Sequence, residues 1–286
     1  ARAINAEVKA GRGTPHGGVY LDIATRRDAE YIKRRLPSMY QQFMELADVD
    51  ITKTPMEVGP TCHYHMGGLR VDAETAATTV PGLFAAGEVA AGLHGANRLG
   101  GNSLSDLVVF GRRAGLYAAE YARSHSQPAS VNADDVESSA RAMLAPFDRP
   151  GGESPYSVHS DREDSMHTLV GIIRTESELE QALDRIGQLK ERLDRVTVQG
   201  NRQFNPGWHL ALDLENMLTV AEAITRSALE RKESRGGHTR DDFPGTDPKL
   251  GRVNVVVRRV NGEMSVTQEP LPPMPDELRK IIEVTT

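Results

Sequence analysis

Hydrophobic and polar positions follow a helical period most clearly in the second half of the chain. Apolar residues recur every three or four positions over 175–196 and again over 209–233, which is typical of amphipathic helices. The first of these segments opens with Thr175-Glu176-Ser177-Glu178, a capping-box sequence. We therefore predict two long helices that pack antiparallel in a bundle. The positions expected to face inward are Leu179, Leu183, Ile186, Leu189, Leu193 and Val196 in the first helix, and Leu210, Leu214, Met217, Leu218, Ala221, Ile224 and Ala228 in the second.

In the first third of the chain the segments with a regular apolar pattern are shorter. Residues 1–10 have the pattern of a helix that glycine closes at Gly11. Alternating apolar and polar residues over 17–23 predict a strand. Residues 28–47 predict a helix that Pro37 interrupts. This part of the chain should therefore combine helices with a small sheet.

Glycine and short apolar runs alternate over residues 56–92, with the segments "CHYHM", "GLRV" and "GLFAAGE". We predict short strands that meet at tight turns. A buried helix is predicted from about Ser103 to Arg123. The residues on its expected inner face are Leu104, Leu107, Val108, Gly111, Gly115 and Ala118.

The remaining segments carry turn signals. Residues 124–162 lack a clear period and contain "RPGGESP", which predicts a surface loop or linker. Near the end, "RVNVVVRRVNGEMSVTQ" holds two alternating runs joined by Asn261-Gly262, a strong β-hairpin signal. The following "PLPPMP" is expected to end regular structure. The fold class predicted for the whole chain is α+β.

Composition narrows the class of protein. With 38% hydrophobic and 26% charged residues, the 286-residue chain resembles an ordinary soluble globular protein. Its net charge of -6 disfavours nucleic acid as the main partner, since phosphate binding needs a basic excess. The single cysteine, Cys62, excludes an internal disulfide and a multi-thiolate metal site. No run approaches the ~18 apolar residues of a membrane span.

The most concentrated candidate chemistry lies in "HGANRLGGNSL" (94–104). Arg98 offers a planar guanidinium that binds carboxylates with two hydrogen bonds, and His94 adds a donor. Gly100 and Gly101 permit close approach of the backbone, and Asn102 or Ser103 can cap the helix that follows. On spacing alone, a capped helix with Arg98 in an ordinary ion pair explains the same residues and is the preferred interpretation.

A second cluster is "PTCHYHMGGLRVD" (60–72). On a strand, His63 and His65 would share one face and Tyr64 would take the other. Two histidines without a third ligand nearby do not make a convincing metal site, so structural histidines are the simpler interpretation. Cys62 is expected to be a small buried hydrophobic residue.

Two further stretches leave alternatives open. In "VPGLFAAGEVA" (80–90), Glu88 would lie at the carboxyl end of a strand, where ribose hydroxyls are bound in dinucleotide folds, or in an exposed turn. The chain contains no GxGxxG sequence. The run "ERKESRGGHTRDDFP" (230–244) alternates in sign, as a solvated surface or a contact rim does.

In combination these segments are more specific. "CHYHMGGLRVD", "VPGLFAAGEVAAGLHGANRLGGNSLSDLVVFGRRAG", "FNPGWHLALDLENML" and "RKESRGGHTRDDFP" follow one another in this order. The chain resembles the carboxyl-terminal half of the flavoprotein subunit of succinate dehydrogenase or fumarate reductase. The resemblance implies an FAD-dependent enzyme that interconverts succinate and fumarate and passes electrons to an iron–sulfur subunit. It also implies membrane-anchor subunits that hold the complex on the cytoplasmic, inner face of a membrane.

The resemblance assigns roles to individual residues. His63 and Arg98 would bind the dicarboxylate substrate, and Glu88 would contact the FAD. Asn102, with Ser103 and Leu104, would bring backbone near the flavin ring. The family's proton-shuttle arginine, its GxGxxG sequence and its flavin-linking histidine are expected upstream of residue 1. We therefore expect this chain alone to hold FAD weakly and not to oxidise succinate, and we expect no metal ligands.

The same resemblance predicts the domains. Residues 1–55 would end a capping domain, 56–123 would close the FAD-binding domain, 124–237 would form a helical bundle domain, and 238–286 a small carboxyl-terminal domain with the hairpin.

Two other interpretations remain open. "GLHGANRL" also occurs in L-aspartate oxidase, a soluble flavoenzyme, although that enzyme tends to have "RLASNSLLE" where this chain has "RLGGNSLSD". Alternatively, the chain could serve as an interaction module without catalysis.

Overall fold

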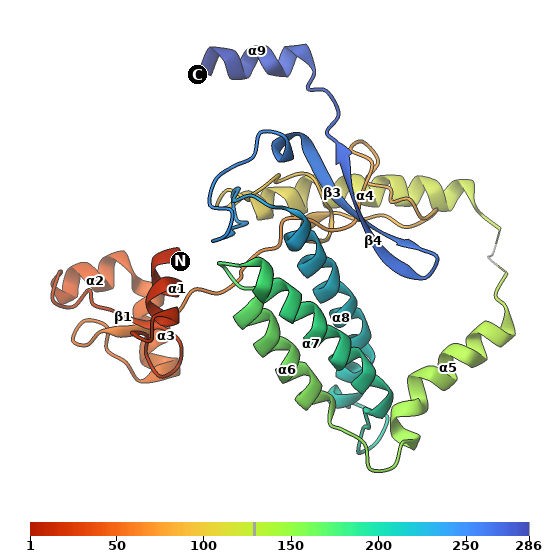
Figure 1. Ribbon diagram of the computed structural model, residues 1–286, viewed down its shortest axis with the longest axis horizontal. Coiled ribbons are helices and arrows are strands. Elements are labelled where there is room, and N and C mark those ends of the chain that lie inside the picture. Colours follow the sequence, from red (N-terminus) through yellow and green to blue (C-terminus); the bar gives the residue numbers. More distant parts are fainter. Residues whose placement is uncertain (128–129, 286) are drawn as a thin grey trace. The chain divides into compact units, whose positions relative to one another are not determined.

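The computed structural model describes residues 1–127 and 130–285, with side chains to residue 281 (Figure 1). These residues form two compact units, 1–63 and 64–286. Each unit has its own buried apolar cluster, so each is described by itself.

The unit of residues 1–63 combines helices with a two-stranded sheet. Strand β1 (Val19–Leu21) pairs antiparallel with β2 (Met56–Val58), which confirms the strand predicted at 17–23. The helices are α1 (Arg2–Lys9), α2 (Ala29–Arg35) and α3 (Pro37–Ala47). Pro37 is the first residue of α3, a position where its missing N–H costs nothing, and this confirms the predicted interruption. Ile32, Ile51 and Met56 form the core of this unit.

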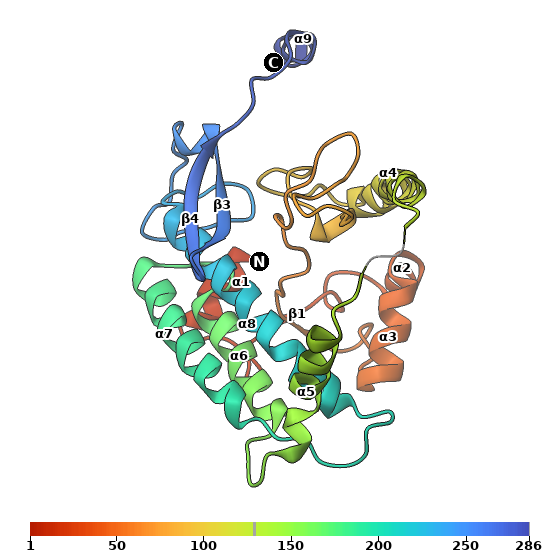
Figure 2. The ribbon, with the colours of Figure 1, turned by 90° about the vertical axis from the view of Figure 1, so that its right-hand side faces the viewer.

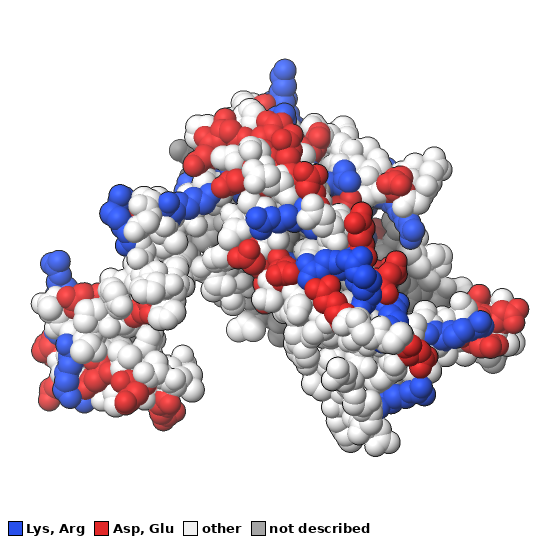
Figure 3. All heavy atoms as spheres, turned by 60° about the horizontal axis from the view of Figure 1, so that its bottom comes forward, with Lys and Arg blue, Asp and Glu red and all other residues white. Residues whose placement is uncertain are grey.

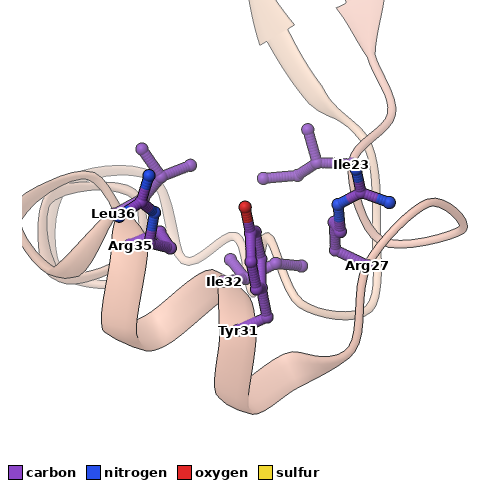
Figure 4. Close-up of a pocket in the computed structure, with 6 residues that line it drawn as sticks. All are labelled: Ile23, Arg27, Tyr31, Ile32, Arg35 and Leu36. Atoms are coloured by element: carbon purple, nitrogen blue, oxygen red, sulfur yellow. The ribbon is translucent and has the colours of Figure 1, made fainter.

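A cavity of about 360 Å³ lies between α2 and the segment after β1. Figure 4 shows the Tyr31 side chain pointing into it between Ile23 and Leu36. The Arg27 guanidinium lies 5.5 Å from the centre of the Tyr31 ring. The other lining residues are Ile32 and Arg35. None of the site residues predicted from the sequence lines this cavity.

The unit of residues 64–286 begins with irregular chain. The strands predicted at "GLRV" and "GLFAAGE" are reduced to single bridges, and the strand predicted at "CHYHM" is wrong. Gly67 and Gly68 explain part of this difference, because both adopt positive φ angles (137° and 134°) that leave strand geometry. A Cβ on Gly68 would lie 2.2 Å from the carbonyl oxygen of Val89, so this glycine allows two backbones to meet. A short 3₁₀ helix, η1 (Gly87–Val89), follows.

Helix α4 (Asn102–Ser124) confirms the predicted helix but not its burial. Leu104, Leu107 and Val108, on the face expected inside, are 69%, 53% and 73% exposed. Around the Cβ positions of Gly111 and Gly115, nothing in the described chain lies within 4 Å. Leu107 lies beside Gly87, but most of this face is exposed, so the expectation of a buried helix is wrong for this chain.

The residue that caps α4 also differs from expectation. Gly101 is the N-cap, with φ +84°, and makes no side-chain hydrogen bond. Asn102 and Ser103 are already helical, so neither caps the helix as predicted. Glycine takes the left-handed conformation without a Cβ clash, which lets the chain enter the helix at this point.

Most of the segment 124–162 is helical, which contradicts the predicted loop. Helix α5 (Ala133–Asp148) is capped by the Asn132 side chain, and α6 (Pro155–Leu169) by that of Ser154. The described irregular residues of this segment are 125–127, 130–132 and 149–154, and residues 128–129 lie outside the described chain. Helix α6 buries Val158 and Ser165 without a continuous apolar stripe, so its pattern gave no helical signal.

Helices α6, α7 (Glu176–Arg192) and α8 (Pro206–Glu230) lie side by side in both ribbon views (Figures 1 and 2). Their shared core contains Val158, Ile186, Leu189, Leu214 and Leu218, which confirms the predicted bundle. A 3₁₀ turn, η2 (Leu193–Arg195), follows α7. On the face seen in Figure 3, acidic and basic side chains are interspersed.

Strands β3 (Val253–Val260) and β4 (Glu263–Pro270) form the predicted hairpin after a 3₁₀ turn, η3 (Leu250–Arg252). Asn261 and Gly262 both have positive φ angles, 52° and 88°, as the favoured two-residue turns require. Helix α9 (Asp276–Thr285) then follows "PLPPMP", so the prediction that regular structure ends there is wrong. Among the described residues, no helix is both long and apolar enough to cross a membrane.

Candidate functional site

Two aromatic rings and two charged groups gather at the start of α4. The guanidinium carbon of Arg98 lies 4.5 Å from the centre of the Tyr64 ring, a distance at which a cation is attracted to the ring face. The His94 ring meets Tyr64 edge to face at 5.5 Å. His94 Nε2 lies 3.2 Å from Oδ2 of Asp106, whose carboxylate is buried near the start of α4. Side chains from three segments of the chain therefore hold the Arg98 loop.

The Tyr64 hydroxyl is buried and has no hydrogen-bond partner within the described chain. Burial, with the negative charges of Asp106 and Glu88, raises the pKa of Tyr64 above its usual value. The phenol therefore stays protonated at neutral pH, and its hydroxyl keeps a donor to offer.

Arg98 also retains unused donors. Its Nη1 donates to the backbone oxygen of Leu99 at 3.2 Å, whereas its Nε is buried without a partner in the described chain. Within residues 1–127 and 130–285, no carboxylate forms an ion pair with Arg98. The ordinary ion pair considered from spacing alone is therefore wrong, and the guanidinium is available to an anion.

Two of the predicted site residues fall in different units. His63 is exposed and is the last residue of the unit 1–63, whereas Arg98 belongs to the other unit. Their joint binding of a substrate therefore stays a prediction. Cys62 is exposed rather than buried, which corrects the expectation for that residue.

Glu88 and the start of α4 are the other residues for which the sequence predicts a role in binding. The Glu88 carboxylate is exposed in η1 and accepts a hydrogen bond from the His65 backbone N–H at 2.9 Å. Around Gly100 and Gly101 nothing in the described chain lies within 4 Å of a Cβ position, so a ligand can approach the backbone. Asn102 and Leu104 are exposed and Ser103 is half-buried. The N-terminus of α4 attracts negative charge, and the η1 segment that holds Glu88 contacts the same helix through Gly87 and Leu107.

The charged segment 230–244 packs against the loop that carries Arg98. Glu233 is 1% exposed and Arg240 is 0% exposed, so the interpretation as a solvated surface is wrong. The backbone N–H of Gly237 donates to the carbonyl oxygen of Ala96 at 2.9 Å, two residues before Arg98. Gly237 and Ala96 lie far apart in the sequence, so a local pattern does not predict this contact. The Gly236-Gly237 pair within a charged run is a local signal that two backbones meet there. Among the described residues, no group of histidine, cysteine, aspartate or glutamate could hold a metal ion.

Two family models match the chain. Residues 1–104 match the FAD binding domain, and residues 159–276 match the fumarate reductase flavoprotein C-terminal domain. The first match indicates FAD as the cofactor of this fold.

Individual proteins support the same assignment. One chain of the fumarate reductase (CoM/CoB) of Methanothermobacter marburgensis is 44% identical, covering 91% of this chain and 46% of that protein. The succinate dehydrogenase flavoprotein subunit of Coxiella burnetii is 39% identical over 86% of this chain and 44% of its own length. The structure of Mycobacterium smegmatis Sdh1 in complex with UQ1 superposes with a TM-score of 0.92 at 57% identity, covering 100% of this chain and 48% of that one. The chain spans about half the length of these relatives, and it belongs to the flavoprotein subunits of the succinate dehydrogenases and fumarate reductases.

Proposed function

We propose that this chain belongs to an FAD-dependent oxidoreductase that interconverts succinate and fumarate, and that Arg98 binds a carboxylate of the substrate. One observation carries the proposal. The Arg98 guanidinium is stacked on Tyr64 with a buried Nε that has no partner in the described chain, directly before the open start of α4. The printed names of the relatives, fumarate reductase and succinate dehydrogenase, support the same substrate pair.

The reaction requires that both carboxylates of the substrate are held in place. Succinate becomes fumarate when one carbon loses a hydride and its neighbour loses a proton, so both carboxylates must be fixed. Arg98 can hold one carboxylate through two parallel hydrogen bonds, and His63 would hold the substrate as a second donor. Bound FAD supplies the hydride acceptor. Stacking against Tyr64 restricts the Arg98 side chain before the substrate arrives, which lowers the entropy cost of binding.

The remaining assignments concern the cofactor and the domains. Glu88 would bind a hydroxyl group of FAD, and Asn102, Ser103 and Leu104 would line the flavin ring. The helix N-terminus beside them favours negative charge on that ring. The domain boundaries 55, 123 and 237 belong to the same proposal and await a test.

Partners are also part of the proposal. We infer that an iron–sulfur subunit accepts the electrons and that membrane-anchor subunits hold the complex on the cytoplasmic face of a membrane. Support comes from a similar structure that carries UQ1 and from another described as a quinol-fumarate reductase with menaquinol molecules.

The test compares Arg98→Ala with wild type in the full-length flavoprotein. We expect kcat/KM for fumarate reduction and for succinate oxidation to fall by at least ~1,000-fold, because a buried charged hydrogen bond to the reacting substrate is lost. Arg141→Ala is the control, since Arg141 is 76% exposed on α5, and we expect activity near that of wild type.

Two outcomes would overturn the proposal. Unchanged activity of Arg98→Ala would favour an interaction module. A higher kcat/KM for L-aspartate than for succinate would favour an L-aspartate oxidase.

A further inference from the structure

The loop that carries Arg98 is supported from behind by a turn far along the chain. Gly237 donates its backbone N–H to the carbonyl oxygen of Ala96 at 2.9 Å. Gly236 has φ +60°, and a Cβ built on it would lie 2.3 Å from the same oxygen. Ordinary contact for a Cβ begins at 3.4 Å, so any side chain at position 236 would displace the loop by about 1 Å.

The turn itself is held rigidly. The buried carboxylate of Glu233 accepts hydrogen bonds from Arg231 Nη1 at 2.6 Å, Arg235 Nε at 3.0 Å and the Asp247 backbone N–H at 2.8 Å. Arg235 and His238 exchange backbone hydrogen bonds of 2.8 and 3.0 Å across the turn. Because both ends are tied down, a clash at Gly236 is relieved more easily by moving the loop 94–98 than by moving the turn.

Arg98 depends on that loop for its position. The loop's other attachments are the His94–Asp106 contact and the stacking of Arg98 on Tyr64. The turn also lies close to the segment that carries Tyr64, because a Cβ on Gly237 would lie 3.0 Å from Cε of Met66, two residues after Tyr64. The turn thus touches the chain on both sides of the Arg98–Tyr64 pair.

We propose that Gly236 is a positioning residue: its missing Cβ lets the turn at 235–238 press against Ala96 and hold the Arg98 guanidinium where it binds the dicarboxylate. This inference rests on the proposed function of Arg98. It links the bundle segment after α8 to substrate affinity, although no side chain of that segment is assigned to the substrate.

The experiment uses the full-length flavoprotein with FAD bound and malonate as a dicarboxylate probe. A displacement of about 1 Å at a binding group costs up to ~100-fold, so we expect Gly236→Ala to raise the Kd of malonate and the KM of fumarate by ~10- to 100-fold. The flavin content should equal that of wild type. Gly262→Ala is the matched control, because Gly262 also has a positive φ (+88°) and nothing in the described chain lies within 4 Å of its Cβ position, and its Kd should stay within about twofold.

A double-mutant cycle separates positioning from general damage. If Gly236 acts through Arg98, Gly236→Ala should add little to the malonate Kd of Arg98→Ala. Two results would overturn the inference. One is full additivity of the two effects on the malonate Kd, and the other is a malonate Kd of Gly236→Ala equal to that of Gly262→Ala.

A second variant tests the inference in case the Gly236→Ala protein does not fold. If the Gly236→Ala protein does not accumulate, Gly237→Ala carries the test. Its Cβ would press on Met66 and lie 3.7 Å from the Ala96 oxygen, so we expect a smaller rise of about two- to fivefold, consistent with the looser contact. No rise would overturn the inference. A malonate Kd that Arg98→Ala leaves unchanged would instead refute the proposed function.

Discussion

A histidine is held neutral among arginines in the loop after α8. Arg174 Nη1 lies 3.0 Å from His238 Nδ1, and a guanidinium has donors only, so Nδ1 must accept. Nε2 then carries the hydrogen and donates to the Arg231 carbonyl oxygen at 2.9 Å. Burial lowers the pKa of His238 to about 4, and the charges of Arg174, Arg240 and Arg231 add to this effect.

The depressed pKa of His238 predicts a pH dependence of stability. The unfolded chain binds this proton near pH 6.5, so the group's contribution is complete above pH 6.5 and is lost as the pH falls toward 4. Between pH 7 and 5 the free energy of unfolding should fall by about 2 kcal/mol from this group. His238→Gln keeps a donor for Arg231 but does not titrate, so its fall should be smaller by that amount. Urea unfolding followed by the fluorescence of the single tryptophan, Trp208, measures the difference.

Between pH 7 and pH 5 the titration of His238 can be measured separately from that of the carboxylates nearby. Burial raises the pKa of Glu233, but its three hydrogen bonds outweigh this and lower it to about 2. The hydrogen bonds from Arg240 likewise lower the pKa of Asp242 to about 2. These groups therefore lose their contributions mainly below pH 5. His16→Gln is the control, since that side chain is 82% exposed, and an equal slope for His238→Gln and wild type would refute the prediction.

Elements with a local signal were predictable, and elements that depend on distant packing were not. The capping box at Thr175, the Asn261-Gly262 turn and the break at Pro37 each act within a few residues. Helix α6 has no apolar period of its own and is stabilised by the core that it shares with α7 and α8. A pattern read along the chain cannot contain that information, because the partners lie tens of residues away.

The N-terminus of α7 joins a local signal to a distant one. Thr175 Oγ1 accepts from the Glu178 N–H at 3.3 Å, while Glu178 Oε2 accepts from the Thr175 N–H at 2.9 Å. Asp242 accepts from the Glu176 N–H at 2.7 Å, so the loop after α8 helps to cap this helix. Three N–H groups that the helix itself leaves unpaired are thereby satisfied.

Removing the cap should destabilise the bundle. We expect Thr175→Ala to lower the free energy of unfolding by about 1 kcal/mol, measured by urea unfolding at pH 7. Thr175→Ser keeps the hydroxyl and should stay within about 0.5 kcal/mol of wild type. Equal losses in the two variants would show that the hydroxyl does not stabilise the helix.

At the scale of the whole molecule, the surroundings of Arg98 could not be predicted from spacing, and the site roles that the resemblance implies stay predictions. Spacing favoured an ion-paired Arg98, whereas its guanidinium lies over the Tyr64 ring, from much earlier in the chain, and the turn at Gly236, much later, contacts Ala96 in the same loop. Such contacts follow from the tertiary fold. The prediction that α4 is buried was wrong for a related reason. The apolar period indicates that one face of the helix has to pack against other residues, but it does not show which segment provides them.

Leu104, Leu107, Val108 and Leu116 are exposed apolar side chains of α4, and they should be buried in the full-length protein, because this chain spans about half the length of its relatives. Exposed positions tolerate polar substitution within about 0.5 kcal/mol, whereas burial of each such side chain contributes ~1.5–3 kcal/mol. The double variant Val108→Gln/Leu116→Gln should therefore leave the stability of the 286-residue chain unchanged and reduce its binding of a hydrophobic dye. In the full-length protein the same variant should lower the free energy of unfolding by about 3 kcal/mol or more.

Val220→Gln, at a position 57% exposed on α8, is the control and should have little effect in either protein. If the double variant destabilises both proteins equally, these side chains already pack within this chain. If it destabilises neither, the rest of the flavoprotein leaves α4 uncovered.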